Sequence, residues 1–176
     1  MTRISLVAAA ATALSAFAIG ACSTSIMSAG TGPKQTFSLT ANDGTARGTI
    51  TVLEQGGQAT LTVTAAGLPA GTHGVHLHEK GLCQGLTFTS AGGYWNPTAR
   101  KHGRDNPAGP HLGDLPNLEV ATSGQATATF SVTSASTMAD ADGTALVVHA
   151  KEDDHRTDPS GNSGDRIACA VIAAPR

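Results

Sequence analysis

Alternating hydrophobic and polar positions run through most of the chain. In the segment 47–54, for example, Ile50 and Val52 alternate with Thr49 and Thr51. A period of two is typical of strands that bury one face. Outside the N-terminal segment no stretch shows a sustained helical period. The pattern predicts eight strands, at residues 36–40, 47–54, 61–65, 74–79, 118–121, 126–132, 145–149 and 167–172.

Tight turns separate the predicted strands, in keeping with the 21 glycines of the chain. Eight short strands joined by glycine turns predict an all-β sandwich or barrel. Aromatic residues make up only 3% of the sequence, so the core must come mainly from Val, Ile, Leu and Ala. Two long connections, residues 80–117 and 151–165, interrupt the pattern. Long ordered loops in a compact domain are usually functional, so we expect the chemistry there.

The N-terminus has a different pattern, in which Arg3 precedes an apolar run over residues 4–19. The run is shorter than the ~20 residues that span a bilayer. A charged start, an apolar middle and small residues at the end indicate a secretory signal. The motif IGAC at residues 19–22 also resembles a bacterial lipobox, which implies cleavage before Cys22 and a lipid on its sulfur. The alternative is a plain signal peptide followed by an incidental cysteine.

The length of 176 residues suits one domain and a targeting segment. We expect a lipoprotein signal peptide at 1–21, a flexible tether at 22–34 and a folded domain at 35–176. The protein would then be exported to the periplasm or cell envelope and held to a membrane through Cys22. The formal net charge of −2 gives no support for nucleic-acid binding, which usually shows a basic patch.

The cysteine count fits export. If Cys22 carries a lipid, Cys83 and Cys169 remain and can pair, because disulfides persist outside the cytoplasm. In the chain-entropy model, closing a loop of that size stabilises the fold by about 4–5 kcal/mol. A cysteine metal ligand is the alternative, although neither cysteine belongs to a CxxC pair.

Five of the seven histidines lie in residues 73–114. Alternate residues of a strand point to the same side, ~6–7 Å apart, so His76 and His78 can share one metal ion. Val75 and Leu77 would then point into a core.

A second set of candidate ligands follows in the Gly- and Pro-rich part of the same stretch. His102, His111 and Asp114 have a spacing that suits zinc. A further histidine, His149, ends the apolar strand at 145–149. A lone histidine is usually a satisfied core or surface residue, but this concentration favours a metal site.

These residues belong to motifs that resemble those of bacterial copper/zinc superoxide dismutases, over roughly residues 36–172. The matching motifs are HGVHLHE at 73–79, SAGGYWNP at 90–97, KHG at 101–103, HLGDLPN at 111–117, LVVHAKEDD at 146–154 and GNSGDRIACAVI at 161–172. The resemblance implies an eight-stranded Greek-key β-barrel or sandwich with two long functional loops.

The resemblance also implies a role for individual residues. Copper would be bound by His76, His78 and His149, and zinc by His102, His111 and Asp114. Asp153 would link a copper ligand to a zinc ligand. Arg166 would guide the anionic substrate, and Cys83–Cys169 would be the family disulfide. His155 matches no functional position, and we expect it to be a solvated loop residue.

The implied activity is the conversion of superoxide to O₂ and hydrogen peroxide at a histidine-ligated copper, with zinc in a structural role.

One departure affects this expectation. Tyr94 stands where the family has the histidine that bridges copper and zinc, and a phenol cannot bridge two metals as an imidazolate does. The alternative is a copper- or zinc-binding module of the same fold with little or no dismutase activity. The adjacent Tyr94 and Trp95 leave a third interpretation, a redox-active tyrosine at copper. The sequence leaves the oligomeric state open, a homodimer included.

Overall fold

The computed structural model describes residues 33–133 and 138–176. The predicted signal peptide, Cys22 and nearly all of the tether lie outside the described residues. No helix of the described part is long and apolar enough to cross a membrane. The strands are β1 (Lys34–Ala41), β2 (Ala46–Gln55), β3 (Gln58–Ala65), β4 (Gly71–His73), β5 (Val75–His78), β6 (Leu118–Val120), β7 (Ala126–Thr133), β8 (Thr144–His149) and β9 (Arg166–Ala173), with one 3-10 turn, η1, at Thr89–Ala91.

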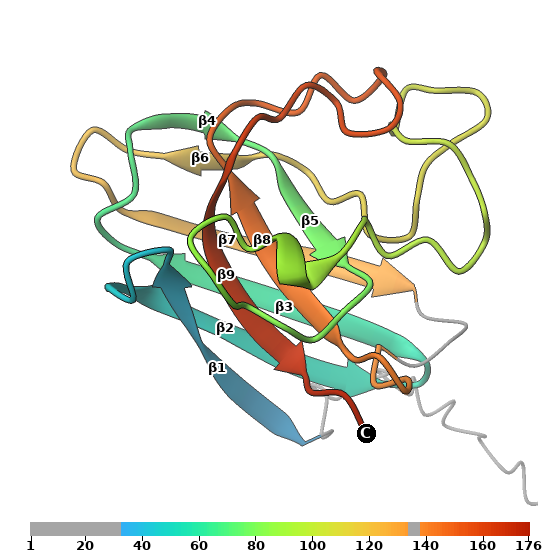
Figure 1. Cartoon of the computed structure of the whole chain (residues 1–176), viewed down its shortest axis with the longest axis horizontal. Helices are drawn as coiled ribbons and strands as arrows, with labels where there is room; N and C mark the ends of the chain where they lie inside the picture. Colours follow the sequence, from blue (N-terminus) through green and yellow to red (C-terminus); the bar gives the residue numbers. More distant parts are fainter. Residues whose placement is uncertain (1–32, 134–137) are drawn as a thin grey trace, which may run out of the picture.

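Seven of these strands form one antiparallel sheet in the order β5-β8-β9-β1-β2-β3-β7. Consecutive strands β7 and β8 are not neighbours in the sheet, an order typical of a Greek key. The sheet curls over its own core, and the ribbon of β4 and β6 lies at one end (Figure 1). This confirms the predicted all-β fold. Among the described strands β5 and β7 do not pair, so the sheet is a half-barrel rather than a closed barrel.

The described residues form nine strands where the sequence pattern predicts eight. The predicted strand 74–79 ends at His78, and a short strand, β4, precedes it. β4 pairs with β6, whereas β5 pairs with β8. The chain therefore passes from the ribbon to the main sheet at Gly74. Alternation alone could not show this change of partner, because residues 73–78, on both sides of the change, are all buried.

The core forms where the alternating apolar positions meet inside the curled sheet. Leu39, Ile50, Leu61 and Val63 are completely buried there, and the threonines between them lie on the outer face. Burying a side chain such as Leu61 stabilises the fold by about 1.5–3 kcal/mol. The expectation of an aliphatic core with few aromatic residues is confirmed.

Strand β8 is buried on both faces, which explains why its sequence is apolar without alternation. Leu146 and Val148 face the main core, whereas Ala145 and Val147 belong to a smaller cluster with Phe88. That second cluster lies under the loop after β5. The outer face of this half of the sheet is thus roofed by loops, and a site there is shielded from water.

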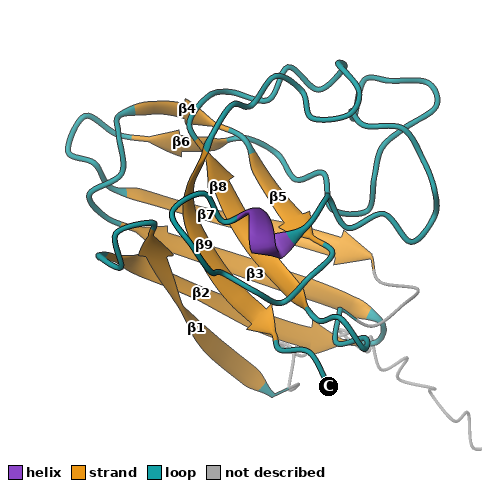
Figure 2. Cartoon of the chain, viewed as in Figure 1, coloured by secondary structure: helices purple, strands orange, loops and turns teal. Residues whose placement is uncertain are grey.

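The two long loops form the roof. Residues 79–117, which contain η1, and residues 150–165 lie together above β5 (Figure 2). A backbone hydrogen bond joins them, from the Asp105 N–H to the His155 carbonyl at 3.0 Å. The disulfide Cys83–Cys169, which the family resemblance implies, ties the first loop to β9.

We expect Leu61→Ala to lower the free energy of unfolding by about 2–5 kcal/mol, because the truncation removes buried area and leaves a cavity. Chemical denaturation followed by circular dichroism measures the change. Thr64→Ala is the matched control on the exposed face of the same strand and should cost less than ~1 kcal/mol. Equal effects at the two positions would contradict this assignment of faces.

Candidate metal centre

Strand geometry brings three histidines together on the roofed face of the sheet. Val75 and Leu77 of β5 face the core, so His76 and His78 face the opposite side. His149 ends the neighbouring strand β8 and pairs in register with Arg166 of β9. The rings of His76 and His149 are 4.9 Å apart between centroids, and those of His78 and His149 are 5.7 Å apart.

The loop after β5 folds back along the free edge of that strand. The Trp95 N–H donates to the Leu77 carbonyl at 2.8 Å, and the Leu77 N–H donates to the Gly113 carbonyl at 2.9 Å. Isolated β-bridges pair His76 with Asp114 and His78 with Tyr94. These contacts carry residues that are distant in sequence to the two histidines of β5.

Hydrogen bonds fix which nitrogen each histidine presents. His76 donates from Nε2 to Asp153 at 2.8 Å. His78 and His149 donate from Nδ1 to the carbonyls of Gly92 and Gly164, at 3.0 and 3.1 Å. A carboxylate or a carbonyl only accepts, so in each neutral ring the opposite nitrogen carries the lone pair.

Three ring nitrogens with unused lone pairs meet on this face of the sheet. They are Nδ1 of His76, Nε2 of His78 and Nε2 of His149, which are buried and have no hydrogen-bond partner among the described residues. Buried polar atoms are almost always satisfied, so three such atoms in one place indicate a ligand. Imidazole nitrogens suit copper, and the set therefore fits the copper ion that the sequence predicted there.

The second predicted set also converges. His102 Nδ1 and His111 Nδ1 lie 3.0 and 3.1 Å from the same oxygen, Oδ1 of Asp114. The other oxygen of Asp114 accepts the backbone N–H groups of Gly103 and His111. Two imidazoles and one carboxylate, with a water as fourth ligand, form a workable zinc sphere.

The two sets are adjacent. Ligand atoms of His76, His102 and Asp114 all lie within 4.8 Å of one another, although the sequence assigned them to different metals. Asp153 joins the sets, since its Oδ2 accepts from His76 and its Oδ1 accepts from His102 Nε2 at 3.0 Å. Gly161 covers this carboxylate in a left-handed conformation, and any β-carbon there would collide with Asp153.

The ring of Tyr94 lies between the two sets of histidines. It stacks on His76 with centroids 3.9 Å apart and planes 16° apart. Its centroid is 5.0 Å from that of His78 and 5.5 Å from that of His102. The phenol O–H donates to the Ser160 carbonyl at 3.2 Å, so the oxygen points to the second loop. Burial raises the pKa of Tyr94 above its usual value of 10, which keeps the phenol neutral.

Arg166 lies near the histidines with free nitrogens, His76, His78 and His149, which we call the copper-type set; His102, His111 and Asp114 are the zinc-type set. Its guanidinium donates to the carbonyls of Phe88 and Gly92 at 2.6 and 2.7 Å. The Gly92 carbonyl also accepts from His78, so the arginine and a predicted copper ligand share one anchor. Arg166 thus brings a positive charge close to His78 and His149, whose pKa values are lowered by burial and, to a smaller extent, by this charge.

Burial and hydrogen bonding set the charges of the site. Burial lowers the pKa of His149 to about 3 and holds the pKa of His78 well below its usual range, so both rings are neutral. Burial alone would lower the pKa of His102, but Asp114 and Asp153 raise it to about 9. Burial alone would raise the pKa of Asp153, yet hydrogen bonds from His102 and His76 keep this carboxyl ionised.

Sequence reasoning missed His155. It was expected to be solvated, but only a quarter of its side chain is exposed and its ring packs against Asp153. Asn117 was also missed, although it holds the backbone of Asp153 through both of its amide atoms. No periodicity or ligand spacing marks either residue, because both act across two loops.

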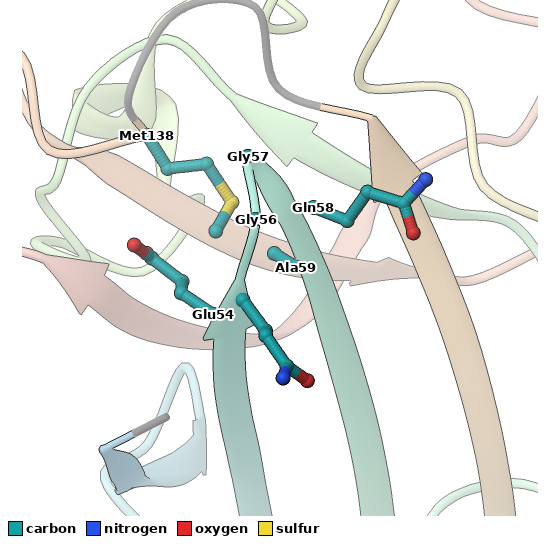
Figure 3. Close-up of a pocket in the computed structure, with 7 residues that line it drawn as sticks. Glu54, Gly56, Gly57, Gln58, Ala59 and Met138 are labelled. Atoms are coloured by element: carbon teal, nitrogen blue, oxygen red, sulfur yellow. The ribbon is translucent and has the colours of Figure 1, made fainter. Parts of the chain in front are cut away.

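A separate hollow lies at the turn between β2 and β3. Figure 3 shows the side chain of Met138 beside this turn, with Glu54 and Gln58 among the other lining residues. The hollow shares no residue with the histidine sets, and its lining offers no cluster of metal ligands. It is therefore not part of the candidate centre.

We expect the metal-free protein to lose stability as the pH falls below about 6.5, the usual pKa of histidine. His78 and His149 are neutral in the folded protein, so below pH 6.5 the unfolded chain binds more protons than the folded one. For His149 this difference continues down to about pH 3. Each group then lowers the free energy of unfolding by up to about 1.4 kcal/mol for every pH unit. His102 contributes oppositely: its stabilisation is complete below pH 6.5 and is lost as the pH rises through about 9.

Denaturation of the metal-free protein at pH 7 and pH 5 measures this slope. His149→Gln removes one of the titrating groups and should flatten it. A stability that is equal or greater at pH 5 would show that the rings are not held neutral.

Comparison with known proteins identifies the family. Residues 46–172 match the family model described as copper/zinc superoxide dismutase. The chain is 38% identical to superoxide dismutase (Cu-Zn) 2 of Aquifex aeolicus over 74% of its own length and 81% of that protein. It is 42% identical to the superoxide dismutase-like protein YojM of Bacillus subtilis over 59% of its own length and 57% of that protein.

A solved structure agrees with these matches. The structure is that of a SOD-like protein from Bacillus subtilis in which one tyrosine and one proline are replaced by histidine. It superposes with a TM-score of 0.74 at 37% identity, over 79% of this chain and 97% of the other. Together with the fold and the two histidine sets, these matches show that the chain belongs to the copper/zinc superoxide dismutase family.

Proposed function

We propose that this protein is an exported superoxide dismutase-like metalloprotein that converts superoxide to O₂ and hydrogen peroxide. Copper would be held by His76, His78 and His149, and zinc by His102, His111 and Asp114. The observation that carries the proposal is the set of three buried ring nitrogens without partners on β5 and β8. A copper ion bound there supplies one-electron redox chemistry.

The residues around the copper set have the properties that this reaction needs. Arg166 offers a positive charge beside the free nitrogens, which attracts an anion such as superoxide. Steering by charge raises association rates strongly, and superoxide dismutase is itself a standard example of this effect. Asp153 holds the His76 ring by its Nε2–H, which keeps Nδ1 available. The two loops and the disulfide keep these groups fixed and largely dry.

A metal-binding module without fast turnover is the second candidate, and Tyr94 is the observation that favours it. The phenol oxygen is engaged by the Ser160 carbonyl and the ring separates the two sets of ligands. No imidazolate joins the metals. Arg166 and Asp153 favour the enzyme, since a module that only stores a metal has no need of an anion guide.

Export and anchoring are part of the proposal. They rest on the apolar run at residues 4–19 and on the lipobox-like motif that ends at Cys22. Loss of membrane association on Cys22→Ser in cells would support the lipid. Unchanged association would show that the chain is held in another way.

We expect the copper- and zinc-loaded protein to dismutate superoxide in a copper-dependent manner, below the ceiling of about 10⁸–10⁹ M⁻¹s⁻¹. Pulse radiolysis measures the rate, and metal analysis of the same sample gives the stoichiometry. His149→Ala should abolish both copper binding and turnover. Full copper occupancy with turnover no faster than that of the copper-free protein would contradict the dismutase and support the metal-binding module instead.

Tyr94→His restores an imidazole between the two sets, and we expect it to raise both the dismutation rate and the affinity for zinc. Tyr94→Phe is the matched control: it removes only the oxygen, which does not point to the ligands, so copper stoichiometry and the Cu(II) electron paramagnetic resonance spectrum should stay as they are. A changed spectrum in Tyr94→Phe would instead make the phenol a ligand. Rates and pH profiles that are equal in all three proteins would contradict a role for Tyr94.

A further inference from the structure

The Asp153 carboxylate is the link between the two predicted metal sites, and three of its four lone-pair positions are filled by hydrogen bonds. Oδ1 accepts from His102 Nε2 at 3.0 Å and from the His155 backbone N–H at 2.7 Å. Oδ2 accepts from His76 Nε2 at 2.8 Å. An ionised carboxylate offers about four such positions, so one remains on Oδ2.

The side chain of His155 faces that remaining position. Its Nδ1 is 3.5 Å from Oδ2 of Asp153 and, within the described part of the chain, makes no hydrogen bond. The separation is longer than an ordinary hydrogen bond. Nδ1 is nevertheless buried, and the Asp153 carboxylate is the favourable partner that the described structure offers it.

Asn117 decides where the proton of His155 lies. The Asn117 Oδ1 accepts the Asp153 N–H at 3.0 Å and its Nδ2 donates to the Asp153 carbonyl at 2.9 Å, which fixes the orientation of the amide. The same Nδ2 lies 3.2 Å from Nε2 of His155. An amide NH₂ only donates, so Nε2 must accept, and the neutral ring carries its proton on Nδ1, facing Asp153.

The backbone keeps His155 in this place. Its φ of 58° is left-handed, which side chains rarely adopt, and its carbonyl accepts from Asp105 in the other loop. Gly103 packs so closely against this carbonyl that a β-carbon there would collide with it. His155 therefore lies between the loop that carries the zinc-type set and the Asp153 carboxylate, which contacts His76 of the copper-type set.

We propose that His155 is a positioning residue of the metal centre: with its proton on Nδ1 it holds the Asp153 carboxylate in place, and through Asp153 it fixes the nitrogen that His76 presents and the orientation of the His102 ring. If the carboxylate turned away, the His76 ring would lose the acceptor that keeps its proton on Nε2, and its Nδ1 would then be protonated part of the time and unable to bind. The His102 ring would lose one of the two carboxylates that orient it. The inference rests on the proposed metal-binding function.

The first test uses the metal-free wild-type protein, so that no variant has to fold. Nitrogen-15 chemical shifts and long-range ¹⁵N–¹H correlations of the histidine rings show which nitrogen carries the proton. We expect Nδ1–H for His155 and Nε2–H for His76. A His155 ring protonated on Nε2 alone would overturn the proposal, because its free Nδ1 would then face the carboxylate with a lone pair.

The second test removes the ring. His155→Gly keeps the backbone N–H and accepts the left-handed conformation. We expect it to raise the dissociation constants of both copper and zinc by about 10–100-fold, the usual effect of removing a group that orients ligands, as measured by competition with chromophoric chelators. In the same variant His76 should become a mixture of tautomers.

Arg156→Gly is the matched control. It adds the same backbone freedom to the same loop but removes only an exposed side chain, which pairs with Asp105 at 3.7 Å. It should leave both dissociation constants within twofold. Equal weakening by the two glycine variants, or no weakening by His155→Gly, would overturn the proposal. Wild-type protein that binds neither metal would refute the proposed function, while the ring tautomers would still decide the role of His155.

Discussion

The metal centre depends on one buried carboxylate, Asp153. It accepts a hydrogen bond from a histidine on each side, His76 and His102, and so fixes the nitrogen that His76 leaves free and the orientation of the His102 ring. A buried carboxylate is costly unless it is paired, and here donors from three segments of the chain surround it. The arrangement makes the two predicted metal sites one electrostatic unit, in which displacement of the carboxylate disturbs both.

The fold explains how this unit can exist. The core fills only the inner side of the curled sheet, so β5 and β8 are free to present histidines on the outer side. The two long loops then cover that face, and the disulfide holds one of them to β9. The hydrophobic core and the metal centre therefore lie on opposite faces of the same strands and share no side chains.

Tyr94 occupies the space at the centre of the site. Its aromatic ring fills the space between the two histidine sets, and its oxygen is directed to a backbone carbonyl of the second loop. A ring of this size stabilises the site by packing against His76, while it offers neither metal an anionic donor. The described residues thus bring three free nitrogens and an arginine together, and Asp153 hydrogen-bonds to a histidine of each predicted set.

The sequence by itself determined the fold class, the aliphatic core and the grouping of the ligand histidines. These follow from local rules: a period of two sets the faces of a strand, and His76 and His78 must share a side. Tertiary structure alone decided the split between β4 and β5, the tautomer of each ring and the part played by His155 and Asn117. Those features depend on contacts between two loops, His155 lying 38 residues from Asn117 along the chain, and local pattern carries no information about such contacts.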